Sequence, residues 1–451
     1  MRVAIVGSGP SAFYAAEHLQ KQAAAGLHID MFERLPTPFG LVRGGVAPDH
    51  PKIKGVTKVY DRIAQHATFR FYGNVTFGQD LTLADIKRLY HAVIFAVGAQ
   101  TDRQLGIPGE DLVGSHAATE FVGWYNAHPD FRDLTFDLSQ KRAAVIGNGN
   151  VAMDVARILA RTVNELHSTD IADYALEALA YSQVEEVYVL GRRGPAQAKF
   201  TPTEIKELGE MEAAGVMVAP EEVALDSLSQ AFVECCADRR VKTNLETLMR
   251  YAQQGPGNVP KRIVMRFLVS PVEIIGSEWV EAIKVIKNEL RESDDGSLRP
   301  RPTDEYETIP VGLVFRSIGY QGVALPDVPF DERRAIIPND EGRVIGADGE
   351  PRVGEYVAGW IKRGPSGIIG TNKPDAQETV NRLLEDCDSL PDPVEPTREA
   401  LEALLAGRGV RYVTYADWQR LDRLEQEQGA ALERPRLKFS RVEDMLAALD
   451  T

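Results

Sequence analysis

Two glycine-rich turns, each placed directly after a short apolar run, constrain this chain more than any other feature. The first turn is Gly7-Ser8-Gly9-Pro10-Ser11-Ala12, and the second is Gly147-Asn148-Gly149-Asn150-Val151-Ala152. Each is followed by an alanine-containing helical pattern, which predicts the start of a β-α-β unit. In such a unit the first glycine permits the turn, the second lets a pyrophosphate approach the backbone, and the helix N-terminus attracts the phosphate. The chain is therefore predicted to contain two Rossmann-like dinucleotide-binding units.

The two units differ at the end of the strand that follows each turn. Glu33 closes the apolar run 29–32, and a carboxylate there accepts hydrogen bonds from ribose hydroxyls and repels a 2′-phosphate. The first unit thus suits FAD or NAD. The run 186–190 ends instead in Gly191-Arg192-Arg193, and two guanidinium groups suit the 2′-phosphate of NADP. This requires the helical insertion at 164–185 to loop out; the alternative is a solvated basic turn.

The remaining pattern is that of an α/β protein. The apolar run 92–97 predicts a buried parallel strand, and the alternating segment 264–286 predicts a small antiparallel excursion. Seven prolines and glycines within 36–51 predict an extended, shaped loop without regular structure. Other expected elements are helices at 11–25, 151–163 and 375–385, strands at 311–319 and 355–359, and a charged helical tail at 397–451.

Composition narrows the functional class. The net charge of −15 disfavours nonspecific binding to nucleic acids. The three cysteines, Cys235, Cys236 and Cys387, form no C-x-x-C pair, so neither a redox disulfide of that pattern nor a cysteine-held iron–sulfur cluster is expected. We expect no metal site. The sequence shows no signal peptide, transit segment or apolar run of about 20 residues, so a cytoplasmic protein is expected.

Several further motifs, in order along the chain, resemble those of the adrenodoxin-reductase-like ferredoxin–NADP⁺ reductases, including bacterial members. They are residues 36–43 (PTPFGLVR), 46–52 (VAPDHPK), 191–195 (GRRGP), 359–365 (GWIKRGP) and 367–373 (GIIGTNK). The resemblance implies two Rossmann-like domains, with an NADP domain at 103–318 inserted into a discontinuous FAD domain at 1–102 and 319–451. The strand-like runs 311–319 and 355–359, which need a sheet to rejoin, agree with this arrangement.

The resemblance also implies which residues contact the two cofactors. FAD contacts are expected from Gly7, Gly9, Pro10, Ala12, Glu33, Leu41, Phe77, Trp360, Gly367, Ile368 and Ile369. NADP contacts are expected from Arg103, Asn148, Gly149, Asn150, Val151, Arg192, Arg193, Glu204 and Gly367. The turn at 364–367 can bring backbone N–H groups to the flavin edge, where they stabilise charge on the reduced ring.

A histidine and a glutamate near the flavin are linked to catalysis in this family, and they map onto His50 and Glu207. Hydride transfer between NADPH and a flavin needs stacking and orientation, with little acid–base work. Two roles therefore stay open for His50 and Glu207. They act directly in catalysis, or they organise the nicotinamide pocket and its water.

The implied reaction passes a hydride from NADPH to the flavin and then single electrons to a small iron–sulfur protein of the ferredoxin type. Such carriers are acidic, and so is this chain, so docking requires a local positive patch. The candidate patch, which we call the basic patch below, is Arg239, Arg240, Lys242, Arg250, Lys261, Arg262 and Arg266. A solvated charged face is the alternative reading.

Other classes share the two glycine turns. A disulfide reductase needs a redox cysteine pair, and a glutamate-synthase small subunit carries N-terminal cluster cysteines, and both are missing from the sequence. A reductase subunit serving another acceptor, and a non-catalytic flavin- or NADP-sensing protein, stay open.

Overall fold

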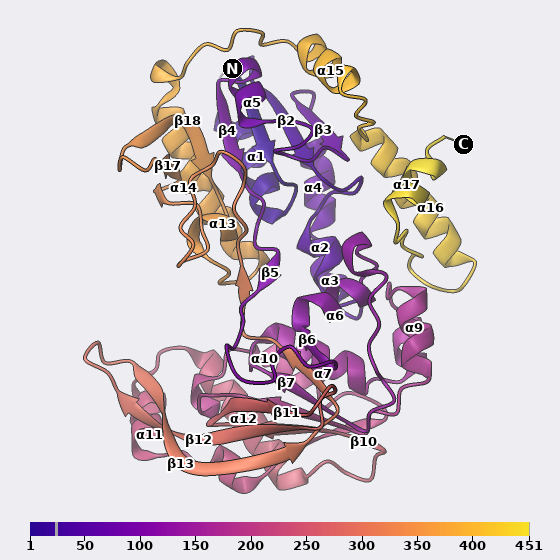
Figure 1. Cartoon of the computed structure of the whole chain (residues 1–451), viewed down its shortest axis with the longest axis vertical. Coiled ribbons are helices and arrows are strands. Elements are labelled where there is room, and N and C mark those ends of the chain that lie inside the picture. The colour runs from indigo at the N-terminus through magenta and orange to yellow at the C-terminus, as the bar shows by residue number, and fades with distance from the viewer. Residues whose placement is uncertain (23–25, 451) are drawn as a thin grey trace.

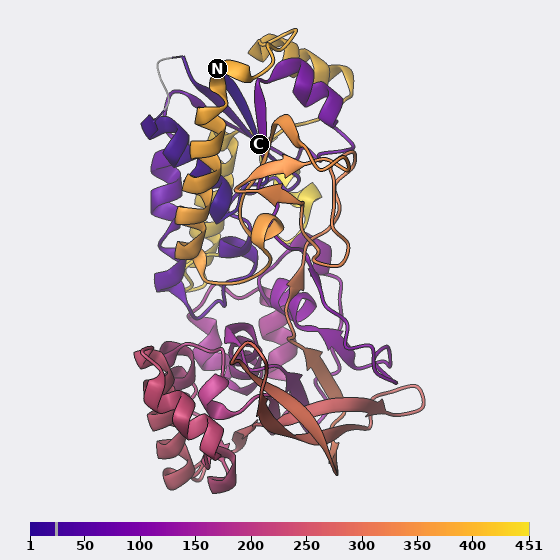
Figure 2. The ribbon, with the colours of Figure 1, turned by 90° about the vertical axis from the view of Figure 1, so that its left-hand side faces the viewer.

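The computed structural model describes residues 1–22 and 26–450 and consists of two α/β units stacked along the long axis (Figure 1). The first unit combines the two ends of the chain, and the second contains its middle part. The view turned by 90° shows the same separation (Figure 2).

The first unit is built on a sheet of seven strands within the described residues, ordered β16-β17-β18-β4-β1-β2-β3. The strands β18, β4, β1, β2 and β3 run parallel, while β17 and β16 extend the edge antiparallel. Their bounds are β1 (Arg2–Val6), β2 (His28–Glu33), β3 (Phe69–Gly73), β4 (Ala92–Phe95), β16 (Asn339–Asp340), β17 (Arg343–Ile345) and β18 (Pro351–Val357).

Alternation along β1 explains how helices cover both faces of this sheet. Val3 and Ile5 point to a core shared with α1 and α14, whereas Ala4 and Val6 point to a core shared with α5 and α15. The helices of this unit are α1 (Pro10–Gln22), α2 (Leu41–Gly44), α3 (Pro51–Lys54), α4 (Thr57–Ala64), α5 (Leu83–Leu89), α13 (Trp360–Arg363), α14 (Asn372–Glu385), α15 (Arg398–Gly407), α16 (Tyr415–Ala430) and α17 (Val442–Ala448).

The second unit is built on a parallel sheet with the order β6-β14-β7-β8-β10-β9. Its strands are β6 (Ser115–Ala117), β7 (Arg142–Ile146), β8 (Glu186–Leu190), β9 (Ala214–Val218), β10 (Lys261–Arg266) and β14 (Leu313–Arg316). Its helices are α6 (Ala118–Tyr125), α7 (Asn150–Ala160), α8 (Val163–His167), α9 (Asp173–Ala180), α10 (Pro202–Glu207), α11 (Ser227–Cys235) and α12 (Arg239–Gln254). Because β7 and β8 are direct neighbours, the insertion carrying α8 and α9 does loop out, as the sequence analysis required.

A three-stranded antiparallel sheet packs on the second unit. It consists of β11 (Val269–Ile275), β12 (Ala282–Glu292) and β13 (Leu298–Pro310), and its apolar face covers Ala144, Ile146 and Val314. The two segments that connect the units, β5 (Thr101–Asp102) and β15 (Tyr320–Gln321), pair with each other. Short 3₁₀ helices complete the fold: η1 (Pro129–Phe131), η2 (Pro195–Gln197), η3 (Pro220–Val223), η4 (Ile369–Thr371) and η5 (Cys387–Ser389).

The α/β fold with two Rossmann-like units is confirmed, but three local predictions were wrong. The stretch 36–51 contains the single-turn helix α2, closed by Gly44 N donating to Gly40 O at 3.0 Å, because one turn fits between the breakers. Residues 264–266 belong to the parallel strand β10, where Ile263 and Met265 are buried. The run 311–319 joins the second sheet as β14, and only 355–359 contributes to the first. Of the predicted helix 11–25, residues 23–25 lie outside the described residues.

The C-terminal tail, from residue 397 onward, contacts both units. Trp418 packs edge-on against Phe39, with ring centroids 5.7 Å apart, as expected for a segment on the FAD side. Beyond α16 the chain crosses to the second unit, where Lys438 Nζ lies 3.2 Å from Asp170 Oδ2 and Arg441 pairs with Asp133 at 2.7 Å. Lys54 of α3 also reaches Asp170, at 2.6 Å, so three parts of the chain meet at one buried carboxylate.

Candidate functional site

The first glycine turn has a closed side and an open side. Gly7 has φ +101°, and a Cβ there would lie 2.5 Å from the carbonyl oxygen of Ala96, so the turn requires glycine. A Cβ on Gly9 would meet no atom within 4 Å. The turn therefore presses against β4 on one side and leaves free space at Gly9, ahead of α1, which begins at Pro10. This is the space that a pyrophosphate needs.

Glu33 stands at the end of β2 beside this turn. Its Oε2 accepts a hydrogen bond from Ser8 Oγ at 2.6 Å, and its Oε1 accepts one from Leu35 N at 3.2 Å. The proline-rich loop closes over the same place, because a Cβ on Gly40 would lie 3.1 Å from Gly9 Cα, and Leu41 follows directly. The structure thus brings Gly9, Glu33 and Leu41 together.

The late segment 359–372 lies against the same helix end. A Cβ on Gly359 (φ +82°) would collide with Ser11 Oγ, and Gly359 N donates to Asp375 Oδ2 at 2.5 Å. Trp360 packs against Tyr320, with ring centroids 5.3 Å apart, and its Nε1 donates to Ser366 O at 3.2 Å. The other residues predicted for FAD lie as follows. Ala12 is buried in α1, and Phe77 packs on Phe95. In the late segment, Gly367 has φ +83°, Ile368 is 59 % exposed and Ile369 is partly buried.

The second glycine turn repeats this design on the other unit. Gly147 has φ +136° and faces the backbone of Ser317, while a Cβ on Gly149 would meet nothing within 4 Å. The carbonyl of Asn148 accepts hydrogen bonds from Lys199 N at 3.0 Å and Phe200 N at 3.1 Å. Asn150 Oδ1 accepts one from Thr201 N at 2.9 Å, and the partly buried Val151 follows on α7. The loop after β8 therefore holds the turn in shape.

Arg192 and Arg193 lie beside this turn, as the sequence analysis predicted. A Cβ on Gly191 would lie 2.8 Å from Asn148 Nδ2, so the end of β8 touches the turn. The backbone of the two arginines is fixed by Asn288 Nδ2 donating to Arg192 O at 3.1 Å and Leu268 N donating to Arg193 O at 3.1 Å. Both guanidinium groups take part in none of the ion pairs found among the described residues, and Arg192 is exposed. They are free to meet an anion.

Arg103 lies on the connection between the units. Its backbone N donates to Gly319 O at 3.0 Å, next to the pairing of β5 with β15. Its side chain is exposed.

His50 and Glu207 come from different units and meet directly. His50 Nε2 lies 2.6 Å from Glu207 Oε2, although the two residues belong to the loop before α3 and to α10. Burial would lower the pKa of His50, but the hydrogen bond to Glu207 and the charges of Asp154 and Glu204 together outweigh burial, and the pKa is raised above its ordinary value. Burial would raise the pKa of Glu207, yet the hydrogen bond and charge of His50 lower it. The protonated form of His50 and the ionised form of Glu207 therefore stabilise each other.

A buried arginine that sequence reasoning missed organises this contact. Arg157 of α7 is fully buried and hydrogen-bonds to Asp49, Asp154, Glu204 and His50. Glu204, predicted to contact NADP, lies inside this cluster, where burial and the carboxylate of Asp154 raise its pKa to about 7. The signal that could have revealed Arg157 is a charged residue between Ala156 and Ile158, on a helix whose neighbours are apolar.

The oxygen and nitrogen atoms of His50, Glu204 and Glu207 lie within 4.8 Å of one another, a spacing that a cation could use. The guanidinium of Arg157 already hydrogen-bonds to His50 and Glu204 there. The expectation that the chain needs no metal stays a prediction.

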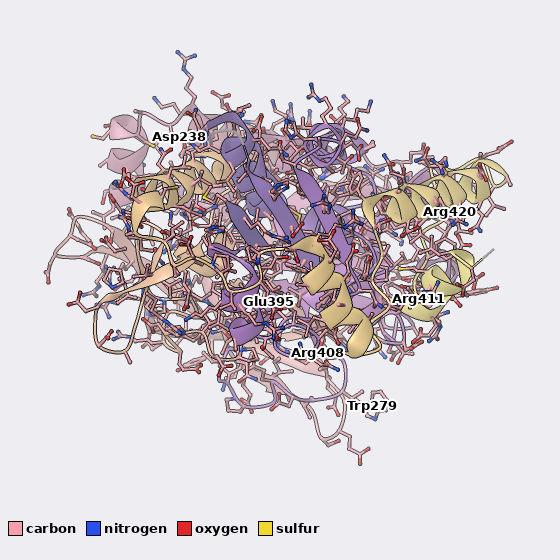
Figure 3. The ribbon with its side chains drawn as sticks, turned by 90° about the horizontal axis from the view of Figure 1, so that it is seen from above. Asp238, Trp279, Glu395, Arg408, Arg411 and Arg420 are labelled. Atoms are coloured by element: carbon pink, nitrogen blue, oxygen red, sulfur yellow. The ribbon has the colours of Figure 1, made fainter. Side chains whose placement is uncertain are left out.

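The basic patch predicted from the sequence is partly neutralised by neighbouring carboxylates. Arg240 pairs with Asp238 at 2.6 Å, Arg266 with Glu222 and Glu307 at 2.6 Å each, and Arg262 lies 3.6 Å from Glu186. Lys261 donates to Leu159 O, and Arg250 stacks on Tyr251. The side chains of Arg239 and Lys242 are exposed and take part in none of the ion pairs found among the described residues. Asp238 lies at the periphery, opposite the part of the tail that carries Arg411 and Arg420 in the view from above (Figure 3).

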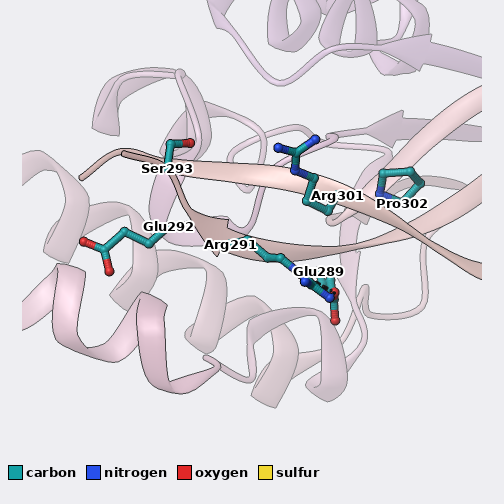
Figure 4. Close-up of a pocket in the computed structure, with 6 residues that line it drawn as sticks. All are labelled: Glu289, Arg291, Glu292, Ser293, Arg301 and Pro302. Carbon is teal, nitrogen blue, oxygen red and sulfur yellow. Dashed lines mark hydrogen bonds and ion pairs between the residues drawn. The ribbon is translucent and has the colours of Figure 1, made fainter. Parts of the chain in front are cut away.

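A surface pocket lies on the hairpin of β12 and β13 (Figure 4). Arg291 in its wall pairs with Glu289 at 2.5 Å. This hairpin forms an outer edge of the second unit in Figure 2, away from the first unit. The pocket therefore plays no part in the site between the units.

Two further findings bear on the functional class. Cys235, Cys236 and Cys387 are free thiols in the described part of the chain. Among residues 1–22 and 26–450, every helix is too short or too polar to cross a bilayer.

Comparison with known proteins agrees with this geometry. Residues 1–227 match the family model described as pyridine nucleotide-disulphide oxidoreductase. The chain is 46 % identical to the NADPH-ferredoxin reductase FprA of Mycobacterium tuberculosis over 98 % of both chains. It is 41 % identical to the mitochondrial NADPH:adrenodoxin oxidoreductase of Salvelinus fontinalis, over 99 % of this chain and 90 % of that protein.

Solved structures give the same result. The structure of M. tuberculosis FprA in complex with NADPH superposes with a TM-score of 0.92 at 45 % identity, covering 100 % of this chain and 99 % of that one. At this identity and coverage the likeness extends through both units and the tail. The chain belongs to the adrenodoxin-reductase-like ferredoxin–NADP⁺ reductase family.

Proposed function

We propose that this chain is an NADPH-dependent ferredoxin reductase, with FAD bound in the first unit and NADP(H) in the second. The observation that carries the proposal is the difference between the two glycine turns. One is flanked by the carboxylate of Glu33 and the other by the unpaired guanidinium groups of Arg192 and Arg193. Family membership supports the same assignment.

The free space at Gly9 fits the pyrophosphate of FAD, and Glu33 would hold the ribose hydroxyls. Pro10 and Ala12 begin the helix whose N-terminus faces that phosphate. The residues we propose to surround the rest of FAD are Gly7, Leu41, Phe77, Trp360, Gly367, Ile368 and Ile369.

NADP would bind across the second turn. Gly149 leaves room for its pyrophosphate, and Arg192 and Arg193 would bind the 2′-phosphate by charge-assisted hydrogen bonds. The other residues we propose to contact NADP are Arg103, Asn148, Asn150, Val151, Glu204 and Gly367. Glu204 would act from within the Arg157 cluster.

We further propose the domain boundaries 1–102 and 319–451 for the FAD domain and 103–318 for the NADP domain. The pairing of β5 with β15 supports them, because the chain leaves and re-enters the first unit at adjacent points.

Bound FAD supplies the ability to accept a hydride and to release electrons singly. The residues of the protein would bind and orient the two cofactors. The rings of Trp360 and Tyr320, with planes tilted by 44°, form a wall at the junction of the units. Gly364 and Gly367 (φ +84° and +83°) shape a turn with backbone free to approach a ligand. His50 and Glu207 hold a proton between the units at Nε2 and Oε2, at the junction where the nicotinamide pocket would form.

The electron acceptor would be a small acidic iron–sulfur carrier. We propose that it docks near Arg239, Arg240 and Lys242, of which Arg239 and Lys242 are exposed and outside the ion pairs of the described residues. Replacing Arg239 and Arg240 by Glu should raise the Michaelis constant for ferredoxin and leave dye reduction by NADPH unchanged. Unchanged ferredoxin kinetics would exclude this patch as the docking site.

An anaerobic titration tests the function itself. The purified holoprotein is mixed with NADPH or NADH in a stopped-flow instrument, and the flavin absorbance is followed. Rapid bleaching by NADPH, with little by NADH, supports the reductase. Binding of NADPH without bleaching would show a nucleotide-sensing protein instead.

A further inference from the structure

Arg157 is the most thoroughly bonded buried charge in the junction between the two units. Its side chain is 0 % exposed, and it projects from α7, the helix that starts at the second glycine turn. A buried guanidinium keeps its charge, because its pKa is far above neutrality, and here it is raised further despite burial, by Asp154 and Asp49. A charge of this kind is retained only when its surroundings compensate it.

The guanidinium joins the two units through a forked pair of hydrogen bonds. Arg157 Nε donates to Asp49 Oδ2 at 2.6 Å, and Nη2 donates to Asp49 Oδ1 at 3.0 Å. Asp49 precedes His50 in the first unit. On the second unit, Arg157 Nη2 donates to Asp154 Oδ1 at 2.6 Å and Nη1 to Glu204 Oε2 at 3.2 Å. The side chain of Arg157 therefore helps to fix the position of His50 relative to α7 and α10.

Two groups close to His50 Nε2 favour opposite protonation states of that nitrogen. Glu207 Oε2, at 2.6 Å, is satisfied by a proton on Nε2. Arg157 Nη2 lies 3.0 Å from Nε2 and directs its two protons to Asp49 and Asp154, so a proton on Nε2 would face the guanidinium charge at short range. A guanidinium has no lone pair to accept that proton. The charge of Arg157 thus opposes the proton that Glu207 favours.

We propose that Arg157 is a positioning residue for the hydride-transfer reaction: it locks the Asp49–His50 segment onto the NADP-binding unit and limits protonation of His50 at Nε2. This rests on the proposed function for its kinetic consequence. The effect on His50 itself depends only on the geometry of this chain.

Every element packed around His50 contributes a charged or titratable group. Asp49 lies on the same loop as His50, Asp154 and Arg157 lie on α7, and Arg161 follows the end of α7. Glu204 and Glu207 lie on α10. The buried hydroxyls of Tyr125 on α6 and Tyr320 on β15 interact electrostatically with Asp154. Arg157 and Arg161 are the permanent cations among these groups, and of the two only Arg157 lies at hydrogen-bond distance from Nε2.

The test separates charge from geometry. In Arg157→Gln the cation is lost, and in Arg157→Lys the cation stays but the fork to Asp49 is lost. Arg161→Lys is the matched control, because Arg161 also pairs with Asp49, at 3.0 Å, without a hydrogen bond to His50. Holoprotein labelled with ¹³C and ¹⁵N in its eight histidines is titrated by NMR, and His50→Gln assigns the signal.

The pKa of His50 should rise by about 1 unit or more in Arg157→Gln, since a neighbouring charge shifts a pKa by about 1–3 units. It should rise less in Arg157→Lys and stay unchanged in Arg161→Lys. An unchanged or lowered pKa in Arg157→Gln would overturn the electrostatic part of the proposal.

The geometric part is tested by transient kinetics. In Arg157→Lys the rate of flavin bleaching by NADPH should fall by roughly 10-fold to 100-fold, the penalty typical of small misplacements, while the dissociation constant for NADP⁺ stays the same. Asp49→Asn cuts the same fork, so the double variant should be no slower than either single variant. An unchanged bleaching rate in Arg157→Lys overturns this part, even if Arg157→Gln does not fold. Absence of bleaching in the wild type would refute the reductase function and leave the NMR result to stand.

Discussion

The carboxylate of Asp170 holds the tail and both units together, so Asp170→Asn should destabilise the protein strongly. The side chain of Lys438 is 2 % exposed and that of Lys54 is 15 % exposed, and both ammonium groups lie within 3.2 Å of Asp170. Breaking a buried pair by removing one partner costs about 3–5 kcal/mol. Lys438 keeps Asn126 Oδ1 at 3.2 Å and Arg43 O at 3.4 Å as acceptors, which favours the lower half of that range.

The loss of stability in Asp170→Asn should depend on pH through the pKa of Lys438. Burial holds the pKa of Lys438 well below its ordinary value, although Asp170 opposes this, so removing Asp170 lowers that pKa further. Between the folded pKa and the unfolded value of about 10.4, the unfolded state binds more protons, and stability rises with pH. The deficit of Asp170→Asn should therefore shrink as pH increases.

Urea unfolding, followed by tryptophan fluorescence at about pH 7 and about pH 9.5, measures both effects. Asp133→Asn is the matched control, because Asp133 pairs with Arg441 of the same tail but is 67 % exposed, and such pairs contribute only about 0–1 kcal/mol. If Asp170→Asn were no less stable than Asp133→Asn, the tail would not fasten the two units through a buried charge.

Three further outcomes are expected. Replacing Arg192 and Arg193 by Ala should raise the Michaelis constant for NADPH about 10-fold to 1,000-fold in steady-state assays and leave NADH turnover unchanged. Gly7→Ala should lower the flavin-to-protein absorbance ratio, because its Cβ would lie 2.5 Å from a carbonyl oxygen at φ +101°. The His50–Glu207 pair, with the pKa of His50 raised and that of Glu207 lowered, adds stability between about pH 4.3 and 6.5. This contribution is lost as pH rises through the folded pKa of His50, so denaturant unfolding of His50→Gln should approach wild type at about pH 8.5.

The glycine turns and their flanking charges were predictable because each is a local requirement of the backbone. Gly7 and Gly147 stand at positive φ. Glu33 ends the strand that follows the first turn, and Arg192 lies just beyond the end of β8, which follows the second. The sequence pattern also predicted that β7 and β8 are neighbouring strands, provided that residues 164–185 loop out between them.

The contacts between the two units could not be predicted from local sequence patterns. Arg157 looks like an ordinary helix residue until Asp49 is brought to it from the other unit. The partition of 311–319 was equally hidden, because Leu313, Val314 and Phe315 are all fully buried and suit either sheet. The crossing of Lys438 to Asp170 depends on how the units stack, which no local pattern encodes.

We expect electrons to pass from NADPH through this chain to an external one-electron carrier. The most direct measurement is the anaerobic absorbance of a purified oxidised ferredoxin mixed with NADPH and a catalytic amount of the holoprotein. We predict that the cluster is reduced with NADPH over many turnovers, and that reduction is much slower with NADH. Flavin reduction without any reduction of the ferredoxin, or equal rates with both nucleotides, would contradict it.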